Sequence, residues 1–306
     1  MSLVDDNLRT NRRLKTAGLW AGRILLVVSI AFIAWELSHH WTAISLWQPT
    51  SSTLLWLTAL AVAYAVSLWL LVEGWHQIIT VFAPEERIRT YPSFAITQIA
   101  KYLPGNIAHL IGRGLYLKGG KISASQIVKA TIAEMAVIPL GALVWILLAG
   151  SAGTRALEAL NIPDFAWPIM AVVLATVLAA LALYCTQYHT LNGPQLRRLI
   201  FAALLSVLFM LALGLIYAAI FGLVGVGPTS DLLVVAIAAW LAGFLTPGAP
   251  GGIGIREATL LLLLGHLELD SSVLLSAALF RIITVSGDFL LFTASWIVYR
   301  KQRSRF

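Results

Sequence analysis

A short segment that carries an arginine occurs twice in this chain. Pro104-Gly105 precedes Arg113 in the first copy, and Pro247-Gly248 precedes Arg256 in the second, with nine residues from proline to arginine in both. A guanidinium can hold a phosphate with two hydrogen bonds, and free backbone N–H groups at a helix start also favour an anion. The repeated segment therefore predicts two sites for an anion. The alternative is that each arginine reaches a polar interface or pairs with a neighbouring carboxylate.

A second pair of charges follows the two copies at a matched spacing. Glu134 lies nine residues after Ser125, and Arg281 lies nine residues after Ser272, each within an apolar stretch. One hypothesis is that Glu134 and Arg281 meet in an ionic pair that protonation of Glu134 would release. Alternatively Arg281 binds a substrate phosphate, while Glu134 binds a cationic group or a coupling proton. A static pair that fixes the helix register is the structural alternative.

Further charged and polar residues extend this set. Glu257 follows the second arginine directly, so it points to a different helix face, and we expect it to cap the segment or pair with Arg281. Asp288 lies seven residues after Arg281 and hence on the same face. Lys101 and Asn106 flank the first proline and glycine and are candidate phosphate contacts. For Lys101, extension to the membrane surface is the alternative.

Composition indicates that these charges lie in a membrane protein. The 306 residues are 59% hydrophobic and 11% charged, which leaves too little polar surface for a water-soluble globule. The single cysteine excludes disulfides, and we predict no metal site and no cofactor. The net charge of +7 comes from basic residues that flank apolar stretches, which indicates topology and not nucleic-acid binding. We predict a single membrane domain over 1–306.

Six stretches are apolar enough to cross about 30 Å of hydrocarbon as helices. They lie at about 17–37, 54–82, 124–149, 166–186, 198–224 and 272–298. Lys and Arg gather before the first stretch, after the second, after the fourth and after the sixth. Because positive residues stay on the cytoplasmic side, we predict a multi-pass protein of the inner membrane with both termini in the cytoplasm.

Two further apolar stretches are interrupted in the middle by proline and glycine. Residues 93–117 and 231–267 each predict a short helix, a break and a second short helix. Broken backbone at membrane depth is tolerated where it is buried in protein or lines a wet cavity. We therefore predict two re-entrant helical hairpins. Their breaks lie at Pro104, Gly105, Pro247, Gly248, Gly251, Gly252 and Gly254.

The order of two spans, a hairpin and one span occurs twice, over about 17–149 and 166–298. Each unit crosses the membrane an odd number of times, so the second unit must be inverted. Inverted repeats that meet at broken helices are typical of alternating-access transporters with a substrate near the midplane. We predict an all-α polytopic fold of about six full spans and two re-entrant hairpins in inverted repeats. The alternative is a duplication that only builds a stable bundle.

The repeated segments also resemble the motifs of a known family. Residues 247–257, Pro-Gly-Ala-Pro-Gly-Gly-Ile-Gly-Ile-Arg-Glu, are followed by Arg281 and resemble the signature of the lysylphosphatidylglycerol synthase transmembrane-region family. Members of this family are also called flippase-like membrane proteins. Residues 101–106, Lys-Tyr-Leu-Pro-Gly-Asn, with Arg113 and Glu134, are similar to the earlier motif of that family.

This resemblance extends over about residues 15–300. Ile-Ala-His at 107–109 departs from it, because many members have more glycine there. Fused members of the family carry a synthase domain that makes aminoacylated phospholipid, and the present sequence has no such domain. The resemblance therefore implies lipid translocation, or export associated with lipid and glycan assembly, and not aminoacyl transfer.

We accordingly predict a lipid flippase that moves an anionic, phosphate-bearing lipid or lipid-linked intermediate between leaflets by alternating access. No ATP-binding motif is present, so transport should be downhill or coupled to an ion gradient, with Glu134 as the first candidate for a proton carrier. The expected partner is a phospholipid or a polyprenyl-phosphate-linked lipid, and nucleic acid is not expected. A homo-oligomer and an associated enzyme of lipid or glycan synthesis stay open.

Two functions of other classes remain as alternatives. The first is a non-catalytic scaffold or accessory subunit for a lipid-modifying or glycosyl-transferring enzyme. The second is an intramembrane enzyme that acts on lipid head groups, with Glu134 or Glu257 as a base. The sequence disfavours the enzyme, because no nucleophile, metal site or carboxylate pair is evident.

Overall fold

The computed structural model describes residues 38, 47–102, 108–151, 192–225, 231–245, 252, 254–264 and 270–303. Every regular element within these ranges is a helix. The elements are α3 (Ser51–Phe82), α4 (Arg87–Ala95), the 3-10 helix η1 (Gln98–Tyr102), α5 (Ala108–Leu117), α6 (Ala124–Ser151), α9 (Gly193–Leu223), α10 (Asp231–Leu245), α11 (Ile255–Leu264) and α12 (Asp270–Arg303).

Four of these helices, α3, α6, α9 and α12, are long and apolar enough to cross a membrane. They cover the second, third, fifth and sixth of the stretches predicted from the sequence. The stretches at 17–37 and 166–186 lie outside the described residues.

Helix α9 begins earlier than predicted because its first turn is capped. The Asn192 side chain accepts a hydrogen bond from the Gln195 N–H, and the Gln195 side chain accepts one from the Asn192 N–H, both at 3.1 Å. This reciprocal arrangement is a capping box, which satisfies two donors that a helix start leaves unpaired. The capping box therefore allows α9 to begin in the polar sequence that precedes the apolar stretch.

Both interrupted stretches contain pairs of short helices. The first holds η1 and α5 after the end of α4, and the second holds α10 and α11. Gly252 and Gly254, which precede α11, have positive φ angles of 73° and 81°, a conformation that glycine adopts without strain. The other predicted break residues lie outside the described ranges; they are Pro104, Gly105, Pro247, Gly248 and Gly251. Asn106 also lies outside these ranges.

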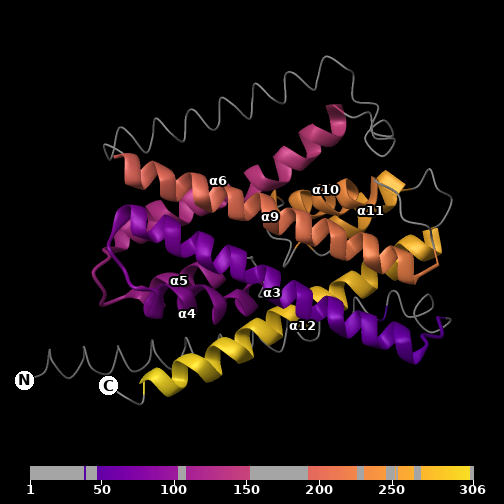
Figure 1. Cartoon of the computed structure of the whole chain (residues 1–306), viewed down its shortest axis with the longest axis horizontal. Helices are drawn as coiled ribbons and strands as arrows, with labels where there is room; N and C mark the ends of the chain where they lie inside the picture. The colour runs from indigo at the N-terminus through magenta and orange to yellow at the C-terminus, as the bar shows by residue number, and fades with distance from the viewer. Residues whose placement is uncertain are drawn as a thin grey trace, which may run out of the picture.

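The long helices cross one another, and the short helices pack between them (Figure 1). Helix α3 packs against α9 and α12, while α9 packs against α3 and α6. Helix α4 lies on α3 and α12, and α10 lies on α9 and α6. Figure 1 shows α4 and α5 toward one end of the long helices and α10 and α11 toward the other.

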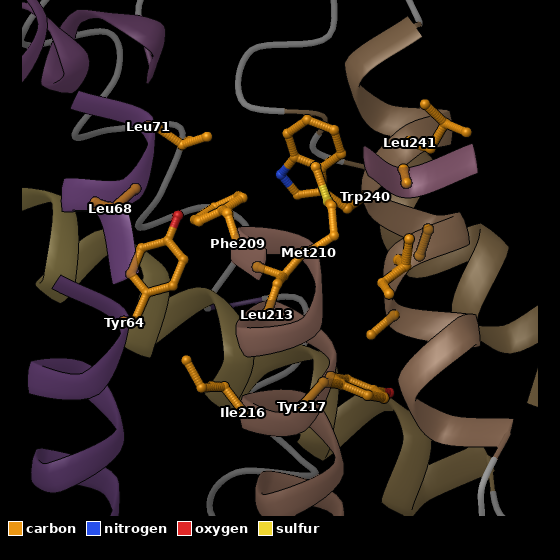
Figure 2. Packing of buried hydrophobic residues seen from close by; sticks show 14 of the residues in the cluster. Tyr64, Leu68, Leu71, Phe209, Met210, Leu213, Ile216, Tyr217, Trp240 and Leu241 are labelled. Atoms are coloured by element: carbon orange, nitrogen blue, oxygen red, sulfur yellow. The ribbon is translucent and has the colours of Figure 1, made fainter. Parts of the chain in front are cut away.

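One apolar core joins these helices. It includes Tyr64 and Leu68 of α3, Phe209 and Met210 of α9, and Trp240 of α10 (Figure 2). Large apolar side chains are also exposed on the outward faces of the long helices, as lipid contact would require. Because lipid tails are as apolar as leucine, such a core stabilises a membrane protein mainly through close packing.

Candidate functional site

A cavity lies between the short helices and the long ones. The volume that the centres of water molecules can reach inside it is about 100 Å³. One water molecule needs about 10–15 Å³ when volume is measured in this way, so the cavity has room for more than one. Lys101, His109 and Arg113 line it from the first pair of short helices, and Trp240 and Arg256 line it from the second pair. The two repeated arginines therefore share one cavity.

The cavity wall has an excess of positive charge. Lys101, Arg113 and Arg256 are cationic, whereas Glu134 is the only carboxylate among the described residues of the wall. The imidazole of His109 adds a buried Nδ1 with no hydrogen-bond partner in the described part of the chain. A cleft of one sign with apolar walls concentrates its electric field and attracts ions of the opposite sign, here anions.

Arg113 is only 2% exposed and is held from several sides. It forms a buried ion pair with Glu134 of α6 and donates to Gln98 Oε1 at 3.2 Å. The rings of Phe94 and Trp75 lie 3.9 and 5.0 Å from its guanidinium carbon, within the range of cation–π interactions. Of the two alternatives for this arginine, the structure therefore shows pairing with a neighbouring carboxylate.

The predicted pair between Glu134 and Arg281 is wrong. Glu134 pairs with Arg113, and Arg281 Nε lies 2.7 Å from Glu257 Oε1. Matched positions on α6 and α12 need not meet, because α6 packs on α9 whereas α12 packs on α3. Each charge pairs instead with the short helix beside its own long helix, α5 beside α6 and α11 beside α12.

Glu257 performs both of the roles predicted for it. One carboxylate oxygen pairs with Arg281, and the other accepts a hydrogen bond from the Gly254 N–H at 2.8 Å. A carboxylate at this position caps the start of α11 and interacts favourably with the helix dipole. Both oxygens of Glu257 are therefore engaged away from the neighbouring Arg256.

Arg256 differs from Arg113 because no carboxylate in the described ranges pairs with it. Its Nε is buried without a hydrogen-bond partner, and its guanidinium carbon lies 5.8 Å from the centre of the Trp240 ring. Trp240 belongs to the same core cluster as Phe209 and Met210 (Figure 2). Because an ionisable side chain is costly at membrane depth, Arg256 is the first candidate among these residues for a functional role.

Two glycines make room for the Arg256 side chain. A Cβ atom on Gly243 would lie 2.7 Å from Arg256 Cγ, and a Cβ on Gly252 would lie 2.8 Å from Arg256 Nε. A Cβ atom does not approach other heavy atoms so closely, and a Cβ on either glycine would also meet the Cα of the other, so a side chain at either position would displace the arginine or the neighbouring backbone. The sequence analysis identified Gly252 as a break but missed Gly243, whose only signal was a small residue within an apolar helix.

Lys101 and Asp288 join the first short helices to the last long helix. Lys101 Nζ lies 2.7 Å from Asp288 Oδ2, and the Tyr102 hydroxyl donates to the same oxygen at 2.5 Å. The Asp288 side chain is fully buried. Lys101 lines the cavity but already forms an ion pair with Asp288. To contact a phosphate as predicted, Lys101 would have to interact with the phosphate and with Asp288 at the same time.

A separate polar junction fixes α4 on α3. Glu73 accepts hydrogen bonds from Tyr91 and from Gln77 at 2.5 Å, and it pairs with Arg87 at 3.1 Å. Burial raises the pKa of Tyr91 to about 12, and the hydrogen bond to Glu73 acts in the same direction. Tyr91 therefore remains a donor at physiological pH, and the junction holds the start of the first short-helix pair in place.

No protein-family model, no curated protein and no solved structure matches the chain. In the described ranges, no group of His, Cys, Asp and Glu side chains could hold a metal ion. Over the part of the chain that the structure describes, the fold and the site define an all-helical arrangement with four helices that could span a membrane and a positively charged cavity between them.

Proposed function

We propose that this protein is a membrane carrier that moves a phosphate-bearing anionic lipid between leaflets by alternating access. The observation that carries the proposal is the shared cavity, in which Arg113 and Arg256 come from different short-helix pairs. Arg256 is partly buried and its Nε is fully enclosed, and a guanidinium without a carboxylate partner is costly in such apolar surroundings. A bound phosphate would offset that cost, whereas a scaffold function would not require an unpaired cation in the cavity.

A lipid suits this cavity because only its head group needs polar surroundings. Met135 of α6 lines the cavity and is also 48% exposed. Val128 and Ile132 are exposed on the same face of that helix. The cavity wall thus continues into an apolar outer surface, and lipid tails could stay in hydrocarbon along α6 while the head group enters.

The helix order supports an inverted repeat. A long helix, short helices and a second long helix occur in the order α3, α4 with η1 and α5, and α6, and again in the order α9, α10 with α11, and α12. The contacts correspond: α3 packs on α12 as α9 packs on α6, and α4 lies on α12 as α10 lies on α6. In our proposal the units predicted at 17–149 and 166–298 exchange roles between the two states of transport.

The proposed orientation follows from the basic ends of the helices. The Gln195 side chain at the start of α9 donates to the Val81 carbonyl near the end of α3 at 3.0 Å. At the start of α6 the Gln126 side chain donates to the Phe82 carbonyl at 2.7 Å. In Figure 1 α12 ends on the same side. Because basic residues gather here, we assign this side and both termini to the cytoplasm, with the inner membrane as the location.

Movement of labelled lipids between leaflets of proteoliposomes tests the proposal. The lipids are phosphatidylglycerol, a polyprenyl phosphate and zwitterionic phosphatidylcholine, and the proteins are the wild type, Arg113→Ala, Arg256→Ala and Arg197→Ala. The Arg197 variant is the matched control, because Arg197 is an exposed arginine that does not line the cavity. We expect faster movement of a phosphate-bearing anionic lipid, lost in the folded Arg256 variant and retained in the Arg197 variant.

Two results would overturn the carrier. One is movement of every anionic lipid at the rate of empty vesicles. The other is an Arg256→Ala protein that is as active as the wild type. Co-purification of a lipid- or glycan-modifying enzyme with an inactive protein would favour the scaffold.

A further inference from the structure

We propose that the cavity is built for one net negative charge, and that a head group with two negative charges enters only when Glu134 takes up one proton. This inference rests on the proposed function and specifies which head groups the carrier accepts and with what coupling. It comes from a count of the charges around the cavity.

The described charges around the cavity leave one cation uncompensated. Three cations each have a carboxylate partner, in the pairs Lys101–Asp288, Arg113–Glu134 and Arg281–Glu257. Arg256 is the cation of the wall that has no carboxylate partner within the described ranges. Counted over the described residues, the resting cavity therefore carries one net positive charge.

A phosphodiester head group matches this charge directly. It has one negative charge, so it can neutralise Arg256 without breaking any of the three pairs. Neutrality matters because an uncompensated charge is unfavourable in the apolar core of a membrane. A monoanion should therefore bind without any change in protonation.

A phosphomonoester presents a second negative charge. Its second pKa is about 6, so at pH 8 it is mostly a dianion. The second charge needs a second cation, and Arg113 lines the same cavity. When Glu134 takes a proton from water, its carboxyl group becomes neutral and Arg113 can bind the phosphate instead. The loaded cavity is then neutral, and the proton returns to water when the head group leaves.

Glu134 suits this role better than Asp288. Glu134 lines the cavity, and its Oε1 has no hydrogen-bond partner in the described part of the chain. Asp288 does not line the cavity, and its Oδ2 is held by Lys101 and by the Tyr102 hydroxyl. Protonating Asp288 would also leave Arg113 in its existing pair.

Other titratable groups face the same cavity and must be distinguished from Glu134. They come from α3, η1, α5 and α11, and they are Tyr64, Lys101, His109, Arg113 and Arg256. The described wall residues of α9 and α10 do not titrate. His109 is the other group that could accept a proton, but its protonation would add positive charge without releasing Arg113.

Calorimetric titration tests the inference on the full-length protein in detergent. Short-chain phosphatidylglycerol serves as the monoanion and short-chain phosphatidic acid as the dianion. Titrations at pH 8 in two buffers with different ionisation enthalpies count the protons taken up per bound lipid. For the wild type we expect no measurable proton uptake when phosphatidylglycerol binds and an uptake of about one proton per bound phosphatidic acid.

Two variants locate the proton. In Glu134→Gln, Arg113 is released permanently, so phosphatidic acid should bind with no proton uptake. If the phosphate itself accepted the proton, this variant would still take one up. His109→Gln should retain the uptake of about one proton, because Glu134 is unchanged.

Infrared difference spectra of the wild type give a second measurement that needs no variant. Adding phosphatidic acid should produce the C=O band of a protonated carboxyl group, which differs from the lipid ester bands in shifting in deuterium oxide, and adding phosphatidylglycerol should produce no such shifting band. This measurement decides the question if Glu134→Gln does not fold.

The possible failures are distinguishable. Binding of phosphatidic acid without proton uptake, equal uptake with both lipids, or uptake that persists in Glu134→Gln would overturn this inference and leave the carrier standing. Loss of uptake in His109→Gln alone would move the proton to the imidazole and also overturn it. Failure of the folded wild type to bind either lipid would overturn the inference together with the proposed carrier.

Discussion

The two arginines of the repeated segment have the same spacing and opposite electrostatic surroundings. In the first half, Gly114 follows Arg113, and Glu134 on the next long helix pairs with the arginine. In the second half, Glu257 follows Arg256 and pairs with Arg281 of the next long helix. The first set of residues is neutral and the second carries one positive charge.

The same spacing of proline and arginine thus gives a neutral ion pair in the first half and a cation that faces the cavity in the second half. The closed pair in the first half fixes α5 against α6 and removes Arg113 from solvent. In the second half the carboxylate has moved to the short helix, where it binds the other arginine and leaves Arg256 facing the cavity. In the proposed carrier, the position of one carboxylate would therefore decide which arginine meets the ligand first.

The largest effect should come from breaking the neutral pair. Arg113→Ala leaves Glu134 buried without its cation, and we expect a loss of about 3–5 kcal/mol in the free energy of unfolding. The double variant Arg113→Met, Glu134→Leu should recover most of that loss, because it removes both charges. Reversible unfolding in mixed micelles measures both. A single variant as stable as the wild type would show that the pair does not hold this half together.

Arg256→Met should have little effect on stability and a large effect on lipid movement. Removing an uncompensated cation should change the free energy of unfolding by less than about 1 kcal/mol. Movement of an anionic lipid in proteoliposomes should fall by roughly tenfold or more, since a charge-assisted bond to phosphate is lost. The same unfolding assay supplies the stability. A strong loss of stability with normal lipid movement would make Arg256 a structural residue.

Gly243→Ala tests whether the position of Arg256 matters. The added methyl group would displace the arginine, and we expect lipid movement to fall by about tenfold. Adding this change to Arg256→Met should have little further effect, since the two act on one contact.

The matched control for Gly243→Ala is Gly222→Ala. Gly222 lies within α9, and a Cβ there would meet no atom within 4 Å. Lipid movement should stay at the wild-type rate in this control. Equal losses in the two alanine variants would show a general sensitivity of helical glycines, with no particular role for Arg256.

Tyr102→Phe should have the smallest effect. It removes one hydrogen bond to Asp288 and leaves the pair with Lys101 intact. Polar contacts between helices in membranes average about 0.6 kcal/mol, so we expect a decrease of that size in the free energy of unfolding. The same micelle assay measures it. A decrease several times larger would mean that the hydroxyl, and not Lys101, holds Asp288.

Sequence reasoning predicted the elements better than their pairings. Apolar length predicted α3, α6, α9 and α12, and the proline and glycine breaks predicted the short helices. Spacing also selected Arg113 and Arg256, which line one cavity. It failed for Glu134 and Arg281, because spacing shows which positions are equivalent and not which helices touch.

The remaining site residues depend on contacts that no local pattern reveals. Gly243 matters through the path of the Arg256 side chain, which is a property of the packed structure. Lys101 and Asp288 meet across most of the chain, so neither could be assigned a partner from its own neighbourhood.

The contact between Tyr102 and Asp288 spans 186 residues, and this distance has a consequence for biosynthesis. A chain made from its N-terminus enters the membrane with Lys101 and Tyr102 long before Asp288 leaves the ribosome. During that interval the lysine must stay in water or near lipid phosphates, because its carboxylate does not yet exist. The arrival of α12 then supplies the missing charge, so insertion of the last described helix completes a site begun by the first short helices.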